Sequence, residues 1–170
     1  MKKTNLSDYD TRNVPDGSRY KIGIIAAEWN PEVTNAMLEG AINTLTQQGV
    51  APSNIIVERV PGTFELSSAA DMMLRCCDVD AVICIGCVIQ GETRHFDFIC
   101  EAVSNGITNA SLNNGKPVIF SVLTTNNMEQ ALARAGGIHG NKGIEGAVTA
   151  LKMCALYDHL HQMSGVVQTK

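Results

Sequence analysis

The sequence predicts an α/β protein, a three-layer sandwich in which helices cover both faces of a four-stranded parallel sheet. Short apolar runs alternate with longer segments whose apolar residues recur every three or four positions, the pattern of strands followed by amphipathic helices. The run within residues 78–89 is apolar without alternation, which indicates a strand covered on both faces. A repeated strand–helix order builds right-handed βαβ units and hence a parallel sheet.

The first strand is predicted at residues 20–27 (YKIGIIAA), a short run rich in isoleucine. A helix follows it directly. Pro31 suits the first turn of that helix, Asn30 suits its N-cap, and Gly49 ends it.

Three further strand–helix pairs follow. The strands are predicted at residues 54–60, 78–89 and 117–123, and the helices at residues 64–74, 95–114 and 128–135. A glycine-rich bend (GGIHGNKG) then leads into a last helix that begins near Ile144.

The glycine-rich bend is not a phosphate-binding loop of a known type. It lacks the Gly-Lys-Ser/Thr order of a P-loop, and no GxGxxG follows the first strand. Four glycines at positions 137, 140, 143 and 146 are predicted to permit a sharp turn between two helices.

Length and composition limit the class of protein. A chain of 170 residues, 45% apolar and 18% charged, is expected to form one domain at residues 19–170, after a polar arm at residues 1–18. A formal charge of −4 argues against a nucleic-acid partner. The sequence shows neither an apolar run long enough for a membrane span nor the apolar core of a secretory signal. A cytoplasmic protein without membrane contact is therefore expected.

The six cysteines lie mostly in apolar segments, as free thiols do in a reducing compartment. Cys84 and Cys87 have the spacing of a metal or redox pair. Residues three apart in a strand, however, face opposite sides of the sheet. We therefore predict that both are core residues and that the chain holds no metal.

The carboxyl ends of the strands are where such sheets bind ligands. His95 is predicted in the first turn of the third helix, where free backbone N–H groups favour an anion. Trp29 and Glu65 follow the first and second strands, and Arg134 is the only cation of the fourth helix. Each also has an ordinary explanation: a surface histidine, a packing tryptophan, a carboxylate at a helix start, and a solvated arginine.

Five motifs follow one another at compatible spacing between residues 20 and 153. They are Trp29-Asn30, residues 60–65 (VPGTFE), residues 88–96 (VIQGETRHF), residues 117–120 with 123–125, and residues 134–136 with 140–143. In this combination the chain resembles the 6,7-dimethyl-8-ribityllumazine synthase family. The flavodoxin-like fold of that family agrees with the sandwich predicted above.

The resemblance implies a transferase of riboflavin biosynthesis that condenses 5-amino-6-(D-ribitylamino)uracil with 3,4-dihydroxy-2-butanone 4-phosphate. Phosphate and water leave, and no metal or organic cofactor is implied. His95 matches the general acid/base of the family, and Arg134 matches its phosphate-binding arginine.

The remaining matched positions are expected to bind substrate. Grouped by expected role, they are Trp29 and Asn30 beside the pyrimidine ring; Thr63, Phe64 and Glu65 on the ring edge and ribityl chain; Cys87, Val88 and Ile89 as backbone contacts; Glu92 and Thr93 at the phosphate; and Phe120, from a neighbouring subunit, and Lys142 lining the site.

The resemblance also implies a homo-oligomer, because each site would need Phe120 from a second subunit and a monomer would lack it. The family forms pentamers, and in many members twelve pentamers close into an icosahedral shell, the type that the short glycine-rich bend favours. The arm of residues 1–18 would add a strand to a neighbour's sheet. Riboflavin synthase is a candidate partner.

The chain departs from the family pattern in three places, one of which is Ile138-His139 in the glycine-rich bend, where a lysine is common. Gln90 stands where arginine is common, and Glu92 brings a carboxylate near the expected phosphate, with Arg94 as a cation to offset it. Two other interpretations stay open. One is a non-catalytic flavin- or lumazine-binding module, for which His95 and Arg134 would have no use; the other is a shell protein that has lost its activity.

Overall fold

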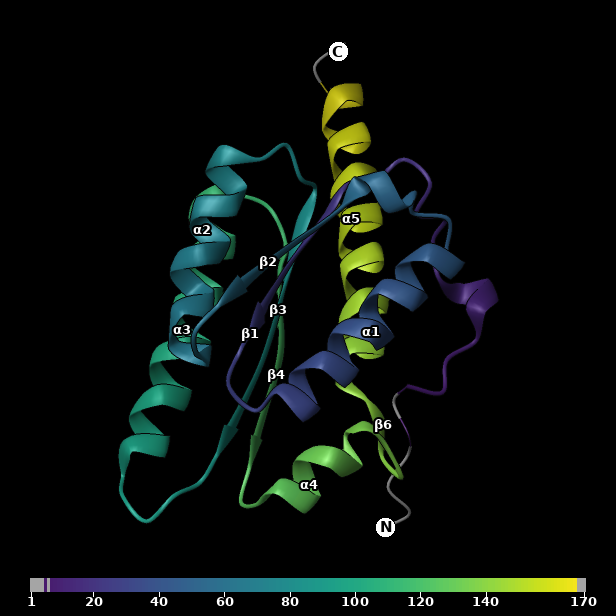
Figure 1. Ribbon diagram of the computed structural model, residues 1–170. Coiled ribbons are helices and arrows are strands. Elements are labelled where there is room, and N and C mark those ends of the chain that lie inside the picture. The colour runs from purple at the N-terminus through teal and green to yellow at the C-terminus, as the bar shows by residue number, and fades with distance from the viewer. Residues whose placement is uncertain (1–4, 6, 168–170) are drawn as a thin grey trace.

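One four-stranded parallel sheet forms the middle layer of the protein (Figure 1). The structure is a computed structural model that describes residues 5 and 7–167. The strands are β1 (Ile22–Ala27), β2 (Ile55–Val60), β3 (Ala81–Ile89) and β4 (Val118–Thr125), in the order β2-β1-β3-β4. The predicted flavodoxin-like α/β sandwich is therefore confirmed.

Helices form the two outer layers. They are α1 (Pro31–Gln47), α2 (Leu66–Cys76), α3 (His95–Asn114), the short α4 (Met128–Ala133) and α5 (Lys142–Val167). Helices α1 and α5 cover one face of the sheet and α2 and α3 cover the other (Figure 1). Within the described residues, no helix combines the length and the apolar character of a membrane span.

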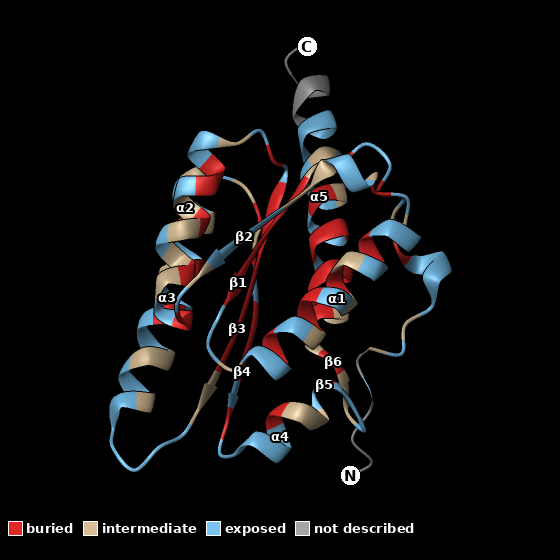
Figure 2. Cartoon of the chain, viewed as in Figure 1, coloured by how far each residue is buried: buried red, intermediate tan, exposed pale blue. Residues whose placement is uncertain are grey.

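The two central strands are buried on both faces, as their unbroken apolar sequences predict. All six residues of β1 and the first seven of β3 are buried (Figure 2). Their side chains alternate between two cores, so that Cys84 packs toward α2 and α3 while Cys87 packs toward α1. The interpretation of these two cysteines as core residues on opposite sides is confirmed.

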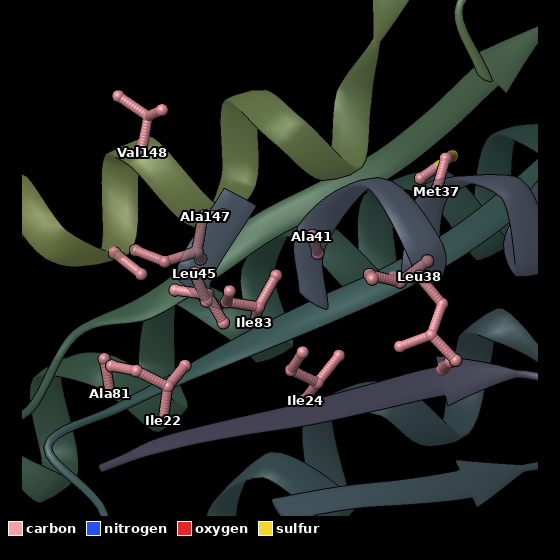
Figure 3. Packing of buried hydrophobic residues seen from close by; sticks show 14 of the residues in the cluster. Ile22, Ile24, Met37, Leu38, Ala41, Leu45, Ala81, Ile83, Ala147 and Val148 are labelled. Atoms are coloured by element: carbon pink, nitrogen blue, oxygen red, sulfur yellow. The ribbon is translucent and has the colours of Figure 1, made fainter. Parts of the chain in front are cut away.

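The larger core lies between the sheet and the pair α1 and α5. Figure 3 shows Ile22, Ile24 and Ile83 of the strands pointing toward Leu45 of α1 and Ala147 of α5. Fully burying each large aliphatic side chain contributes about 1.5–3 kcal/mol. The small residues Ala41 and Ala147 allow the two helix backbones to approach each other above the sheet.

Two of the four glycines assigned to the turn serve another purpose. Gly143 and Gly146 lie inside α5, not in the turn before it. A Cβ atom on Gly143 would overlap the carbonyl oxygen of Met37 in α1, and one on Gly146 would lie 2.7 Å from Oγ of Ser121 in β4. Their glycine character therefore permits close packing of α5 against α1 and β4.

The turn itself is a small hairpin. Strands β5 (Ala135–Gly137) and β6 (Gly140–Asn141) pair antiparallel between α4 and α5. Gly136 and Gly140 adopt positive φ angles of 116° and 84°, which side chains disfavour. Helix α4 therefore ends two residues earlier than predicted, and α5 begins two residues earlier.

The described part of the N-terminal arm packs on its own chain. It includes the 3₁₀ turn η1 (Thr11–Asn13), and its Val14 is buried. Where the arm joins β1, Tyr20 is buried and donates its hydroxyl to Asp158 of α5 at 2.7 Å. Residues 1–4 and 6 lie outside the described part. The expected pairing of the arm with a neighbour's sheet stays a prediction, for which the edge strand β2 has residues 57–59 exposed.

The close contact of α5 with α1 makes Gly143 the glycine most sensitive to substitution. Gly143→Ala should lower the free energy of unfolding by about 1–3 kcal/mol or more, because its methyl group meets backbone that cannot move aside. Urea unfolding followed by circular dichroism measures the change.

Gly91→Ala is the matched control for that experiment. Nothing lies within 4 Å of a Cβ atom at Gly91. The free energy of unfolding of this variant should stay the same or rise by up to about 1 kcal/mol. Equal stability losses in the two variants would contradict the packing role of Gly143.

Candidate active site

The site begins where the sheet changes its direction of winding. From β1 the chain crosses to α1 on one face, whereas from β3 it crosses to α3 on the other. Such a divergence leaves a crevice at the carboxyl ends of two neighbouring strands. On the β3 side of that crevice, residues 86–89 pair with β4 alone, since the pairing of β3 with β1 ends at Ile85.

Trp29 lies at the rim of this crevice with 65% of its surface exposed. Its backbone N–H donates to the carbonyl of Pro61 at 3.1 Å, which ties the end of β1 to the end of β2. A Cβ atom on Gly62 would lie 2.6 Å from the indole ring. The ring therefore packs closely on Gly62 while most of its surface stays exposed.

Asn30 occupies the predicted N-cap position of α1 but does not cap the helix with its side chain. It adopts the left-handed conformation (φ 58°), and its amide donates to the carbonyl of Cys87 at 3.0 Å. The hydroxyl of Thr63, which is only 5% exposed, donates to the same carbonyl at 3.3 Å. These two side chains thus join the ends of β1, β2 and β3, a role that local sequence rules do not indicate.

The Glu65 carboxylate is hydrogen-bonded within its own turn. Its Oε2 accepts the backbone N–H of Gly62 at 3.0 Å, and the side chain is half-buried. This bond closes the short 3₁₀ turn η3 (Thr63–Glu65) and orients the carboxylate beside Trp29. Binding of a substrate hydroxyl by Glu65 stays a prediction.

His95 is the first residue of α3, as predicted. Its backbone N–H donates to Oγ1 of Thr93 at 3.4 Å, so the Thr93 hydroxyl lies at the start of a helix of 20 residues. The His95 side chain is exposed and lines a pocket of about 420 Å³ together with Phe64 and Phe98. A proton-transferring side chain and free helix N–H groups therefore lie beside an aromatic wall.

Arg94 does not offset the charge of Glu92 in the expected way. Its Nε lies 3.7 Å from Oδ2 of Asp97, and its guanidinium carbon lies 5.9 Å from the centre of the Phe98 ring. The side chain therefore points along α3. Glu92 is exposed in the loop before it.

Arg134 and Lys142, the two cations assigned to the site, are neighbours through their backbones but lie away from the pocket of His95. Arg134 follows α4, is exposed, and lines a pocket of about 460 Å³ with Thr124, Thr125 and His139. Lys142 donates its backbone N–H to the carbonyl of Arg134 at 2.9 Å.

The Lys142 side chain pairs within its own helix. Its ammonium lies 2.9 Å from Oε2 of Glu145, one turn further along α5. Because both side chains are largely buried, this pair is screened less than a surface pair would be.

His95 and Arg134 are both at the carboxyl-end edge of the sheet, but within one chain they do not form one site. Helix α3 lies on one side of the sheet, whereas α4 and the β5–β6 hairpin lie on the side of α1 and α5 (Figure 1). The pockets lined by His95 and by Arg134 share no residue. Phe120, 38% exposed on β4, is opposite Cys84 and thus on the α3 side.

The two cysteines of β3, Cys84 and Cys87, are buried and poorly suited to act as metal ligands or nucleophiles. Among the described residues, no three His, Cys, Asp or Glu side chains are grouped to hold a metal ion. Burial raises the pKa of Cys84 to about 12 and that of Cys87 to about 11. Both thiols are therefore protonated near neutral pH.

The similarity to known proteins decides the family. A family model described as 6,7-dimethyl-8-ribityllumazine synthase matches residues 19–158. The chain belongs to the 6,7-dimethyl-8-ribityllumazine synthase family. A protein with that name from Cytophaga hutchinsonii is 59% identical over 89% of this chain and 94% of its own length. One from Porphyromonas gingivalis is 56% identical over the same shares of the two chains.

The buried thiols of this family member should resist alkylation. For a thiol with a pKa of about 11 or higher, about 0.1% or less is present as thiolate at pH 8. Iodoacetamide at pH 8 should label the exposed Cys76 first and leave Cys84, Cys87 and Cys154 unmodified, as mass spectrometry of peptides would show. Labelling of all six in urea is the control, and equal rates for Cys76 and Cys87 in the folded protein would contradict the prediction.

Proposed function

We propose that this chain catalyses the condensation of 5-amino-6-(D-ribitylamino)uracil with 3,4-dihydroxy-2-butanone 4-phosphate to 6,7-dimethyl-8-ribityllumazine, with release of phosphate and water. The placement of His95 at the start of α3, in one pocket with Phe64, carries this proposal. The exposed ring of Trp29 lies at the same carboxyl-end edge of the sheet. The match to the family over residues 19–158 supports it. The relatives named above carry the name of the enzyme, so nothing favours a non-catalytic lumazine-binding module.

The pyrimidine is proposed to lie on Trp29 at the crevice. The carbonyl of Cys87 already accepts two hydrogen bonds, from Asn30 and Thr63. Backbone contacts to the ring therefore fall to Val88 and Ile89. The ribityl chain would extend toward Glu65, whose Oε1 is directed by the bond of its other oxygen to Gly62.

His95 is proposed to move the protons. Forming the imine between the amine and the ketone removes water, and loss of phosphate requires that a proton leave carbon. A histidine does both near neutral pH. Bringing two reactants together in one pocket accounts for much of the remaining acceleration.

The phosphate is proposed to lie at the start of α3, next to Glu92 and Thr93. Backbone N–H groups and the Thr93 hydroxyl would bind it from its own chain. Arg134 and Lys142 would reach it from a neighbouring copy together with Phe120, because within one chain Arg134 and Lys142 lie on the other side of the sheet. The enzyme is then a homo-oligomer by necessity.

We further propose that this oligomer is a pentamer, and that the short β5–β6 hairpin suits a shell of twelve pentamers. The edge strand β2 leaves residues 57–59 exposed for a neighbour's N-terminal arm. The six free thiols fit a reducing compartment, the cytoplasm. Riboflavin synthase, which uses the product, is the proposed partner.

The proposed reaction predicts a fluorescence signal. Purified protein incubated with both substrates should form lumazine faster than the substrates do alone, as its fluorescence reports. Failure of the unaltered protein to exceed the uncatalysed rate would refute the enzymatic function.

Arg134→Ala should raise KM for the butanone phosphate by about tenfold, since one charge-assisted contact is lost.

The role proposed for His95 predicts a partial loss. His95→Ala should lower kcat by about 100-fold or less, because proton transfer is one contribution and positioning remains. KM for the pyrimidine should stay unchanged. His159→Ala, an exposed histidine on α5, is the matched control and should retain full activity. Complete inactivity of His95→Ala with intact pyrimidine binding would show that the partial role is wrong.

A site shared between copies predicts complementation. His95→Ala and Arg134→Ala chains, co-expressed with different tags and purified as mixed oligomers, should recover activity, because about one site in four combines two intact halves. If both residues served the same copy's site, the mixed oligomer would show only the average of the two parents. Separately purified variants, mixed without subunit exchange, are the control.

A further inference from the structure

We propose that Asn141 is a positioning residue for the phosphate subsite, which holds Lys142 and Arg134 in place through the first turn of α5. The proposal rests on the function proposed above, which places these two cations at the phosphate of a neighbouring copy. Asn141 touches no substrate in this scheme. Its effect is exerted through the backbone that carries the cations.

Every polar group of Asn141 has a partner. The side chain is buried, and its Oδ1 accepts the backbone N–H groups of Gly143 at 2.8 Å and Ile144 at 3.4 Å. These two bonds cap the N-terminus of α5. Lys142 lies between the cap and the bonded residues, so the cap fixes its backbone.

The amide nitrogen of Asn141 ties that first turn to α1. Nδ2 donates to the carbonyl of Ala36 at 3.0 Å. A Cβ atom on Gly40 would lie 2.7 Å from the same nitrogen, so the Asn141 amide packs closely on Gly40 of α1. Figure 1 shows the lower end of α5 and the β5–β6 hairpin close to α1, where this contact lies.

The backbone then links the two cations. The N–H of Lys142 donates to the carbonyl of Arg134 at 2.9 Å, and the carbonyl of Lys142 accepts the hydroxyl of Ser121 at 2.7 Å. Because Lys142 is held on both sides, a movement at Asn141 shifts Lys142 and Arg134 together. The arm adds one more contact, since Oγ of Ser7 accepts the Asn141 N–H at 2.6 Å.

Loss of the Asn141 side chain should therefore affect one substrate and not the other. Asn141→Ala removes the cap and the tie to α1, and KM for the butanone phosphate should rise about tenfold, since misplacement by about 1 Å can cost up to 100-fold. KM for the pyrimidine should stay unchanged, because Trp29 and Phe64 belong to the other half-site. The inhibition constant of inorganic phosphate should rise with KM for the butanone phosphate.

Two further variants separate the capping of α5 by Oδ1 of Asn141 from the hydrogen bond of its Nδ2 to Ala36. Asn141→Ser keeps an oxygen that can cap α5 but loses the donor to Ala36, and it should recover part of the phosphate affinity. Asn141→Asp keeps the size and the capping oxygen but sets an acceptor against the Ala36 carbonyl, and it should behave like Asn141→Ala. If Asn141→Ala does not fold, the serine variant carries the test with an expected rise in KM of about threefold.

Asn114→Ala is the matched control. This half-buried asparagine also joins two helices, with Nδ2 bonded to Oδ1 of Asp71 and to the carbonyl of Ala110. Its replacement should lower the melting temperature and leave both KM values unchanged.

The result decides between positioning and general stability. A rise confined to the butanone phosphate and to inorganic phosphate supports the proposal. Equal changes in both KM values, or none in a folded Asn141 variant, overturn it. If Arg134→Ala raises KM for the butanone phosphate and the Asn141 variants do not, only the positioning role fails. If the unaltered protein forms no lumazine, the proposed function itself fails.

Discussion

The candidate site depends on the hydrogen bond from the Asn30 amide to the Cys87 carbonyl, which spans the gap between the carboxyl ends of β1 and β3. At this point β1 sends the chain to one face of the sheet and β3 sends it to the other, so the two strand ends separate. A buried carbonyl left without a partner there would cost about 1–3 kcal/mol. Asn30 and Thr63 both donate to it, and this satisfies the carbonyl while it fixes the spacing of three strand ends. The crevice is therefore rigid on the side where Trp29 lies, which a stacking surface requires.

The features that could be predicted from the sequence are those set by local periodicity. The strands β1 and β3 are apolar runs because both faces are buried, and a period of two or of 3.6 is visible without any knowledge of distant contacts. Features set by distant contacts were missed or misread. Gly143 belongs to a turn motif by its sequence, but its actual constraint is the Met37 carbonyl in another helix. Asn30 looks like a helix cap, but its amide bonds to a strand end 57 residues away.

The candidate site divides in the same way. Trp29, Glu65 and His95 follow three strands of one parallel sheet, so their place at its carboxyl-end edge could be predicted from chain order alone. The position of Arg134 could not. It depends on α4 ending early and on the β5–β6 hairpin carrying the chain beneath α1, on the other side of the sheet from α3. One chain would thus contain both halves of the proposed site but present them in different places. A cyclic arrangement, in which each copy offers one half to the next, is the simplest way for every copy to obtain a whole site.

This division would also explain how a phosphate could bind beside the loop before α3. Gln90 is neutral, Glu92 is negative, and Arg94 is turned toward Asp97, so a phosphate at the start of α3 would meet almost no net positive charge from nearby side chains. An exposed pair such as Arg94 with Asp97 is worth only about 0–1 kcal/mol, so it can open, but Arg94 would then merely balance Glu92. Arg134 of a neighbouring copy would supply the missing charge. Lys142 would add to it only when its pair with Glu145 opens. Because both residues are fixed through the capped start of α5 and its close contact with α1, little side-chain and backbone freedom remains to be lost when a phosphate binds. In this scheme the electrostatics of the phosphate subsite depend on the rigidity of α5.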